Sequence, residues 1–370
     1  MLPSHLTFYL FCLLLLYQLY LVLRHFVPLL QFNQETKPTE QAVSVIICAH
    51  NELPNLQKNL TSVLTQTHQN FEVIVVDDRS HDGSYEWLID LKATFTHLKV
   101  IRIDEVPHHF NSKKYAITIG VKAASHELLL FTDADCKINS EHWVDIMSQS
   151  FTEKTNFVLG VSLYEKHNGF LNLFIRYETY QTALLYLSRA LAGKPYMGVG
   201  RNMAYRKSLF LEKKGFYGFQ QLTGGDDDLL INKHATGVNT RICTAQNTVN
   251  YSSPKMSWHD LINQKKRHYA VGKYYKNRDK LFLGMLQLST VLTYSLFIII
   301  LYQPETIFIY ISILLMILRF IGQYVVYVKL STKFGDDFKP WLLPILELYY
   351  SFFHAIIGLW AVSSKSIRWK

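Results

Sequence analysis

ELLLFTDADC, residues 127–136, is the most informative segment of this 370-residue chain. Its first half is a short apolar run, and its second half contains Asp133-Ala134-Asp135. The run predicts a buried strand, so the two carboxylates follow at the point where the strand opens into a loop. Ligands of open α/β sheets bind at the carboxyl ends of the strands. Two oxygen ligands at that place indicate a site for Mg²⁺ or Mn²⁺ held against a diphosphate.

Three other segments have a strand-like composition, and helical patterns separate them. The expected strands are residues 43–48 (VSVIIC), 71–76 (FEVIVV), 99–103 and 128–131, and the expected helices are residues 53–67, 85–94 and 113–124. Strands that alternate with helices predict an α/β fold with a mostly parallel sheet flanked by helices.

Polar side chains follow two of these strands as well. Ala49-His50-Asn51-Glu52 comes after the first strand, and Asp77-Asp78-Arg79-Ser80 comes after the second. The carboxyl ends of neighbouring parallel strands meet at one edge of a sheet, so these residues and Asp133-Ala134-Asp135 are expected to surround one ligand. The plain alternative is three unrelated polar turns, because Asp and Ser favour turns and helix caps.

The composition favours a membrane protein, with 49% hydrophobic and only 18% charged residues. Residues 6–23 are apolar over the length that a bilayer needs. Arg24 and Lys37 follow this segment and no Lys or Arg precedes it, which predicts an amino terminus outside and the next domain in the cytoplasm. We expect the excess of Lys and Arg, which gives a net charge of +9, to lie beside the membrane helices. The alternative is that these basic residues attract anionic lipid or nucleotide. The absence of a basic helix or aromatic–basic repeat argues against a nucleic-acid partner.

The carboxyl-terminal part is also apolar. Residues 281–302 and 307–328 are expected to span the membrane, and basic residues crowd the approach to the first of them. Residues 329–339 are an expected cytoplasmic return loop, and the Asp336-Asp337 pair in it is interpreted as solvated charge. Residues 341–362 contain Pro344 and Glu347. A third span there would put the basic tail outside, so a re-entrant or interfacial segment is favoured.

Six segments of the chain are similar to the motifs of a known protein family. They are VSVIICAHNE (43–52), VIVVDDRSHDGS (73–84), SKKYAITIGVKAA (112–124), LLLFTDADC (128–136), GVGRNMAYRKSLF (198–210) and GGDDDLL (224–230). In this order the chain resembles the family 2 glycosyltransferases, which have the GT-A fold, a Rossmann-like α/β sheet. The resemblance covers about residues 42–276 and is specific for the family but not for the substrate.

The resemblance implies a role for each polar strand end. Asp77 and Asp78 would bind the base and ribose of a nucleotide sugar, and Ala49, Glu52 and Lys113 would border the same donor pocket. Asp133 and Asp135 would hold Mg²⁺ or Mn²⁺, with Asp133 also next to the donor. A surface lysine at a helix start is the plain alternative for Lys113.

Asp226-Asp227-Asp228 corresponds to the acidic motif that supplies the catalytic base in this family. Direct displacement at an anomeric carbon needs a carboxylate that takes the proton of the acceptor hydroxyl. Neighbouring acids repel one another, which raises a pKa toward the useful range. Asp227 is the expected base, Asp226 is the second choice, and Asp228 is expected to start a helix. The alternative is that all three only cap that helix.

Two more segments carry implied roles. Gly200, Arg201 and Asn202 resemble the acceptor segment of the family, with a tight turn as the alternative. Gln264-x-x-Arg267-His268 resembles the Gln-x-x-Arg-Trp motif of the membrane-bound branch, whose members include cellulose, chitin and hyaluronan synthases. Gln264 and Arg267 would lie over the donor, and His268 replaces the Trp of that motif. A basic helix that flanks the membrane is the alternative.

The expected function is that of an integral membrane enzyme, in a bacterial inner membrane, with its catalytic domain in the cytoplasm. It would be an inverting glycosyltransferase that moves a sugar from a nucleotide sugar, expected to be a UDP-sugar, to a lipid, lipid-linked or glycan acceptor in cell-envelope glycan synthesis. The expected parts are an anchor (residues 1–30), the GT-A domain (40–280) and a membrane region (281–370).

Two other functions stay open from the sequence. A processive polysaccharide synthase is favoured by Gln264 and Arg267, but few expected spans are available to form a polymer channel. A non-catalytic nucleotide-binding membrane scaffold would require the metal-binding and basic carboxylates to be idle, although all of them are present.

Overall fold

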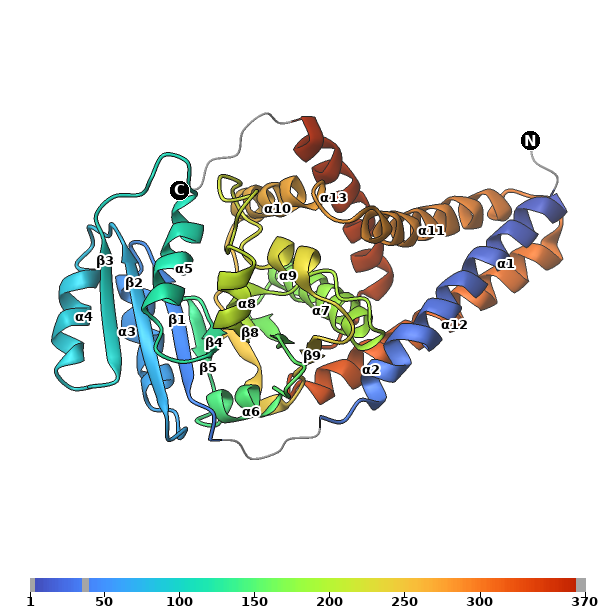
Figure 1. The fold of residues 1–370 in the computed structure, drawn as a ribbon. Coiled ribbons are helices and arrows are strands. Elements are labelled where there is room, and N and C mark those ends of the chain that lie inside the picture. Colours follow the sequence, from blue (N-terminus) through green and yellow to red (C-terminus); the bar gives the residue numbers. More distant parts are fainter. Residues whose placement is uncertain (1–3, 35–39, 364–370) are drawn as a thin grey trace.

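The computed structural model describes residues 4–34 and 40–363, which form an α/β body and a projecting arm of helices (Figure 1). In spatial order, the main sheet contains β3 (Leu98–Ile103), β2 (Phe71–Asp78), β1 (Val43–Ala49), β4 (Leu128–Phe131), β8 (Met203–Arg206), β6 (Phe157–Leu159) and β9 (Thr240–Ile242). A smaller sheet contains β5 (Cys136–Ile138), β10 (Asn250–Ser252) and β7 (Ser162–Tyr164).

The mostly parallel sheet is confirmed. β1 pairs in parallel with β2 and β4, and β2 pairs in parallel with β3. β8 is antiparallel to both β4 and β6, while β9 is parallel to β6. All four predicted strands are present, so the carboxyl ends of β1, β2 and β4 lie at one edge of the sheet. The short strands β5 to β10 were not predicted.

Helices cover both faces of this sheet. In the α/β body they are α3 (Leu53–Leu64), α4 (Ser84–Lys92), α5 (Ser112–Ala123), α6 (Trp143–Gln149), α7 (Phe170–Leu191), α8 (Lys207–Glu212), α9 (Asp228–His234) and α10 (Trp258–Gly272). α5 packs tightly on β1, since a Cβ at Gly120 would lie 2.8 Å from Cγ2 of Ile46. This close contact fixes the start of α5, where Lys113 lies, relative to the strand ends.

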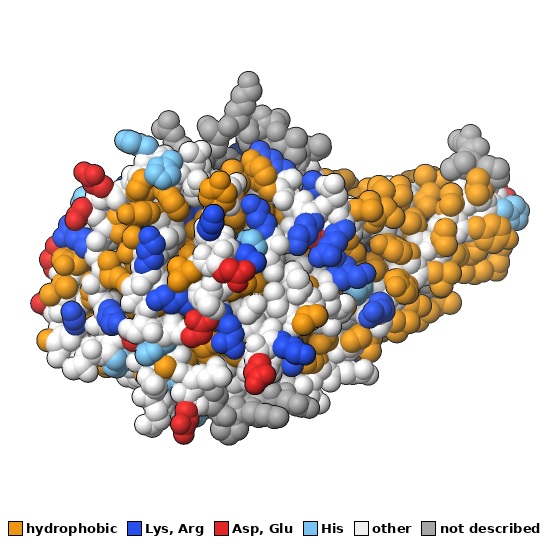
Figure 2. Space-filling model, in the orientation of Figure 1, with side chains coloured by type: hydrophobic (Ala, Val, Ile, Leu, Met, Phe, Trp, Pro, Cys, Tyr) orange, Lys and Arg blue, Asp and Glu red, His pale blue; other side chains and the backbone are white. Residues whose placement is uncertain are grey.

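The arm consists of three helices side by side. α1 (Ser4–Leu21) continues through a π-helical turn (Val22–Phe26) into α2 (Val27–Gln31) and runs beside α11 (Asn277–Leu301) and α12 (Thr306–Lys333) (Figure 1). Three helical segments, Ser4–Gln31, Asn277–Leu301 and Thr306–Lys333, are long and apolar enough to cross a membrane. On the face that Figure 2 shows, hydrophobic side chains dominate the arm, whereas Lys, Arg, Asp and Glu side chains are scattered over the body.

The last helix, α13 (Leu343–Ser363), has a different orientation. It lies across the base of the arm rather than along it (Figure 1) and packs against α10. Its exposed apolar side chains follow helical spacing: Ile345, Leu348, Tyr349, Phe352, Ile356 and Trp360. One apolar face and one packed face are typical of a helix that lies in the plane of a membrane surface. The three-part division of the chain and its orientation stay predictions.

The sequence interpretation of the Asp336-Asp337 pair as solvated charge was wrong for Asp336, whose side chain is 10% exposed, whereas that of Asp337 is 57% exposed. Arg176 Nη2 donates to both carboxylates of the pair, at 2.9 Å from Asp336 Oδ1 and 3.0 Å from Asp337 Oδ1. Tyr180 donates a further hydrogen bond of 2.7 Å to Asp336. The partners lie on α7, about 160 residues earlier, so the local polar sequence could not indicate this connection between the body and the end of α12.

Candidate active site

The three strand ends open into one large cavity. Its volume is about 1530 Å³, and its lining includes Ala49, Glu52, Asp78, Lys113, Asp133, Asp135, Arg201, Asp226, Asp227, Gln264 and Arg267. Gly200 lines a small pocket at its floor, together with Lys113 and Asp227. Residues of the expected site that are far apart in the sequence are therefore brought together by the sheet.

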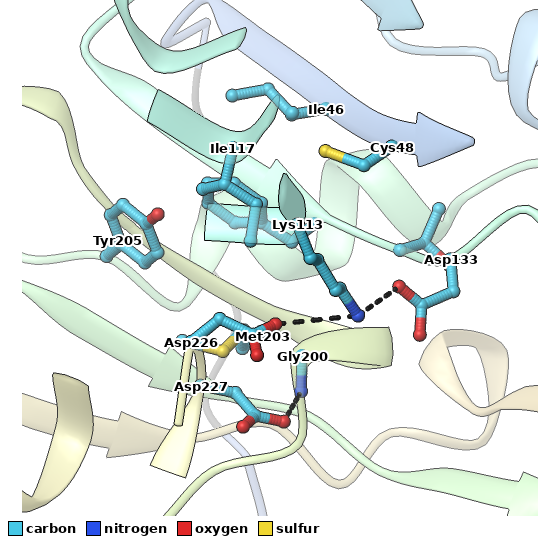
Figure 3. A pocket seen from close by; sticks show the side chains of 12 residues that line it. Ile46, Cys48, Lys113, Ile117, Asp133, Gly200, Met203, Tyr205, Asp226 and Asp227 are labelled. Carbon is cyan, nitrogen blue, oxygen red and sulfur yellow. Dashed lines mark hydrogen bonds and ion pairs between the residues drawn. The ribbon is translucent and has the colours of Figure 1, made fainter. Parts of the chain in front are cut away.

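Lys113 is the centre of this arrangement (Figure 3). Its Nζ lies 3.2 Å from Asp133 Oδ1 and 3.4 Å from Asp226 Oδ2, so it connects the end of β4 to the loop before α9. Burial would lower the pKa of Lys113, but Asp133 and Asp226 outweigh this effect and hold it well above its ordinary value. Lys113 therefore places a permanent positive charge between two carboxylates.

The three consecutive aspartates have different surroundings. Burial would raise the pKa of Asp226, but Lys113 and Lys114 outweigh it and lower the pKa below its ordinary value. For Asp227, burial and the neighbouring Asp226 raise the pKa. For Asp228, burial and Asp227 raise the pKa to about 8. Only one of the three is thus paired with a cation, and the other two keep a stronger affinity for a proton.

Asp227 is held by backbone donors rather than by a cation. Gly200 N–H donates to Oδ2 at 2.8 Å (Figure 3), and Asp228 N–H donates to Oδ1 at 2.7 Å. A Cβ at Gly200 would lie 3.3 Å from Asp227 Oδ2, so glycine permits this approach. Asp228 starts α9, as expected, and accepts a 2.7 Å hydrogen bond from Tyr275. The carboxylate of Asp227 is therefore fixed in orientation without a cation, whereas that of Asp226 is paired with Lys113.

Asp133 and Asp135 are oriented toward the same cavity from the turn after β4. Ser252 donates to Asp135 Oδ2 at 2.8 Å, and Asn59 donates to the Ala134 carbonyl at 3.1 Å, which fixes the turn. No group of three or more His, Cys, Asp or Glu suited to a metal ion occurs among residues 4–34 and 40–363. Two carboxylates fit Mg²⁺ or Mn²⁺ all the same, because such ions often bind one or two carboxylates and complete their coordination with phosphate and water.

Asp77 and Asp78 end β2 but differ in access. Asp78 lines the cavity, and its Oδ2 is buried without a hydrogen-bond partner, while Arg79 donates to Oδ1 at 2.8 Å. A buried carboxylate oxygen that receives no hydrogen bond from the protein is available to accept one from a ligand. Asp77 lies behind it with no exposed surface and is not part of the cavity lining. Asp78 is therefore the residue of the pair that can contact a nucleotide directly.

The neighbouring loops are shaped by unusual backbone angles. Asn51, after β1, and Arg79, after β2, have φ of 54° and 55°, a region that non-glycine residues rarely adopt. Ser80 Oγ accepts from Asn51 N–H at 2.9 Å, and Asn51 Oδ1 accepts from His81 N–H at 2.8 Å. Strained backbone that is locked by reciprocal bonds is common where a loop must hold a ligand. Glu52 follows in this loop, and burial raises its pKa.

The expected acceptor segment has mixed roles. Arg201 lines the cavity, and its guanidinium lies 4.4 Å from the centre of the Tyr164 ring. Asn202 is completely buried. Its Oδ1 accepts a hydrogen bond from Trp143 Nε1 at 3.1 Å, and its Nδ2 donates to the carbonyls of Val161 and Thr248. These bonds are all directed into the protein, so Asn202 supports the segment from within and its amide is not available to a ligand.

Helix α10 forms one wall of the cavity. Gln264 Nε2 lies 3.2 Å from the Tyr164 hydroxyl, and Arg267 is close enough to Asp226 for their charges to interact, although burial lowers the pKa of Arg267. Both side chains line the cavity, as the resemblance implies. Tyr164 and Tyr275 were missed at the sequence level, because neither belongs to a polar motif and both reach the site only through the fold.

Comparisons with known proteins agree with this geometry. The profile described as "Glycosyl transferase family 2" matches residues 44–212, and the profile described as "Glycosyl transferase family group 2" matches residues 129–360, which is more than half of the chain.

Two curated relatives are similar over part of the chain. A 4,4'-diaponeurosporenoate glycosyltransferase of Staphylococcus haemolyticus is 33% identical over 127 residues, which are 34% of this chain and 33% of that protein. An undecaprenyl-phosphate 4-deoxy-4-formamido-L-arabinose transferase of Aeromonas hydrophila is 36% identical over 96 residues, or 25% of this chain and 28% of that protein. The chain thus spans about a third of the length of these relatives.

The fold extends further than the sequence similarity. A mannosyltransferase of Pyrobaculum calidifontis, solved with GDP-Man and Mn²⁺, superimposes with a TM-score of 0.59 at 16% identity and covers 96% of this chain and 98% of its own. It shows that the α/β body and the helices share a GT-A arrangement with a known protein. The chain belongs to the family 2 glycosyltransferases.

Proposed function

We propose that this protein is a membrane-anchored, inverting transferase that moves a sugar from a nucleotide sugar to a hydroxyl group of a lipid, lipid-linked or glycan acceptor at the cytoplasmic membrane surface. The observation that carries the proposal is the convergence of Asp78, Asp133, Lys113 and Asp227 on one cavity next to apolar helices. The mannosyltransferase solved with GDP-Man and Mn²⁺ has the same fold and supports a nucleotide-sugar donor.

Asp227 acts as the base in this proposal. Its carboxylate is unpaired with any cation in the part of the chain that the structure describes, its pKa is raised, and two backbone N–H groups fix its orientation. Such a group accepts a proton from an acceptor more readily than Asp226, whose charge Lys113 neutralises. Attack from the side of Asp227, opposite the departing diphosphate, inverts the anomeric carbon.

The donor lies between the strand ends and Lys113. Asp78, with its free buried oxygen, binds the nucleoside, and Lys113 and Arg267 provide positive charge for the diphosphate. Asp133 and Asp135 would hold Mg²⁺ or Mn²⁺, which neutralises charge on the leaving diphosphate when it is bound. Lys113 reaches both Asp133 and Asp226, and so it connects the carboxylate beside the donor to the residue that precedes the base.

A donor screen tests the proposal. The purified full-length protein in phospholipid nanodiscs is given UDP- and GDP-sugars together with lipid extract, in Mg²⁺, Mn²⁺ or EDTA, and release of nucleoside diphosphate is measured. We expect lipid-dependent release with one donor and loss of it in EDTA. No release with any donor, and no nucleotide binding, would refute the proposal. The length of the product separates single transfer from processive synthesis.

A further inference from the structure

The catalytic cavity does not end at the donor site. It continues away from Asp227 to the base of the arm, where its wall changes from loops to helices α7, α11 and α13. The wall at this end contains Leu283, Gly284, Leu286 and Gln287 of α11, and Ser351, Ala355 and Gly358 of α13. We call this end of the cavity, defined by these seven residues, the α11–α13 passage. It connects a catalytic site to helices that are apolar enough to lie in a membrane.

The two helices meet only along part of their length. Gln287 Nε2 donates to the Ser351 carbonyl at 2.9 Å, and Tyr294 donates to Glu347 at 2.8 Å, which joins α11 to the first half of α13. Nearer to the start of α11, a Cβ at Gly284 would meet no atom within 4 Å. Across the passage, a Cβ at Gly358 would contact only the Tyr269 ring, at 3.5 Å. Small residues thus leave the passage open beside Gly284.

The edges of the passage are apolar and face outward. Leu281, Met285 and Leu288 of α11 are 67%, 45% and 51% exposed. On α13, Phe352 and Ile356 are 58% and 62% exposed. Exposure of this many large apolar side chains on adjacent helices indicates contact with lipid. A hydrocarbon chain therefore needs to cross no polar surface between a bilayer and the passage.

Basic side chains line the same cavity. Lys273 directly follows α10, and Lys280 lies at the start of α11, one turn before Gly284. Lys265 of α10 also lines the cavity, but its charge is paired with Glu178. Cations next to an apolar passage suit a lipid whose head group carries phosphate. A soluble sugar acceptor would need neither the apolar edges nor the connection to the membrane helices.

We propose that the α11–α13 passage holds the hydrocarbon chain of a lipid acceptor whose head group carries phosphate, so that a hydroxyl of this head group reaches Asp227. The inference rests on the proposed function and assigns the acceptor class to it. Gly284 is the residue that keeps the passage open, so a larger side chain there blocks the acceptor without touching the donor site.

The test compares Gly284→Leu with Gly322→Leu. Gly322 is also an exposed glycine in a helix, and a Cβ there would likewise meet no atom within 4 Å, but it lies on α12 and outside the cavity lining. The probe is a long-chain alkyl phosphate with a diazirine at the end of the chain, photolysed with each protein in phosphatidylcholine nanodiscs. Labelled peptides are identified by mass spectrometry, and nucleotide binding is measured with UDP and GDP in Mn²⁺.

We expect the wild type and Gly322→Leu to be labelled at α11 and α13. A leucine at position 284 should reduce that labelling on the order of tenfold, because its side chain occupies the space that the hydrocarbon chain needs. Nucleotide binding should be unchanged in all three proteins. Gly284→Ala, with a smaller side chain, should give an intermediate loss and serves if the leucine variant fails to fold.

Two results separate the inference from the proposed function. Equal labelling in Gly284→Leu and Gly322→Leu, or labelling confined to the outer faces of α1 and α12, would overturn the passage even when nucleotide binds normally. A wild type that binds neither nucleotide but is labelled in the passage would refute the donor site while supporting the lipid site.

Discussion

The clearest physical test of how the arm supports the cavity is a buried ion pair between α12 and α13. Arg319 Nη1 and Nη2 each donate to a different Glu347 oxygen at 2.7 Å, and each side chain is only 9% exposed. Gln323 and Tyr294 donate to Glu347 at 3.0 and 2.8 Å, while Gln18 of α1 accepts from Arg319 at 2.6 Å. This network connects α1, α11, α12 and α13, and Glu347 also lines the cavity.

Removing Arg319 and removing Glu347 should destabilise the protein to different degrees. In Arg319→Leu, Glu347 keeps two donors and can become neutral by taking up a proton. In Glu347→Leu, the guanidinium stays charged and keeps mainly the Gln18 oxygen. Removing one partner of a buried pair costs about 3–5 kcal/mol. We therefore expect about 3 kcal/mol for Arg319→Leu and about 5 kcal/mol for Glu347→Leu, with much less for the double variant.

Thermal unfolding in detergent measures these costs. At about 2 °C per kcal/mol, Tm should fall by about 6 °C and about 10 °C in the two single variants and recover in the double variant. The reasoning is refuted if Arg319→Leu is the more damaging change, or if the double variant loses as much as the two single variants together.

Two further predictions concern the α/β body. Burial and Asp227 raise the pKa of Asp228 to about 8. Because a carboxyl of the unfolded chain titrates near pH 4, the contribution of Asp228 to stability is complete below about pH 4 and is lost as pH rises through about 8. Asp228→Asn should therefore unfold at a higher Tm than the wild type at about pH 8, with a smaller difference at about pH 5; a difference independent of pH would contradict this. Asn202→Ala removes hydrogen bonds to Trp143 Nε1 and two buried carbonyls and should cost about 3 kcal/mol or more. Its Tm should fall by several degrees, and an unchanged Tm would show that the amide is dispensable.

The sequence predicted the part of the fold that depends on local pattern. β1, β2 and β4 are mostly apolar runs that are followed by or end in polar residues, and a parallel sheet places such ends together. The helical start at Asp228 follows from the same kind of local signal. These elements position Asp78, Asp133 and Asp227, and so the candidate site could be assembled from local patterns and the resemblance.

Other features depend on partners that are distant in the sequence. β6, β8 and β9 are three or four residues long and exist because of pairing across the sheet. Asp336 looked solvated because its partner, Arg176, is far away in the chain. Asn202 resembled an acceptor contact, but its amide is used by the core. Short strands and buried polar contacts carry no periodic signal, since tertiary packing alone decides them.

The central claim is that Asp227 removes the proton of the acceptor, and the most direct measurement is the transfer rate of Asp227→Asn with the donor and lipid that the screen identifies. The amide keeps the size of the side chain but cannot take up the proton, so kcat should fall about 10²- to 10⁴-fold while nucleotide affinity stays close to that of the wild type. In the wild type, the rate should fall as pH is lowered through the raised pKa of Asp227. A variant that transfers sugar at the wild-type rate would contradict the account.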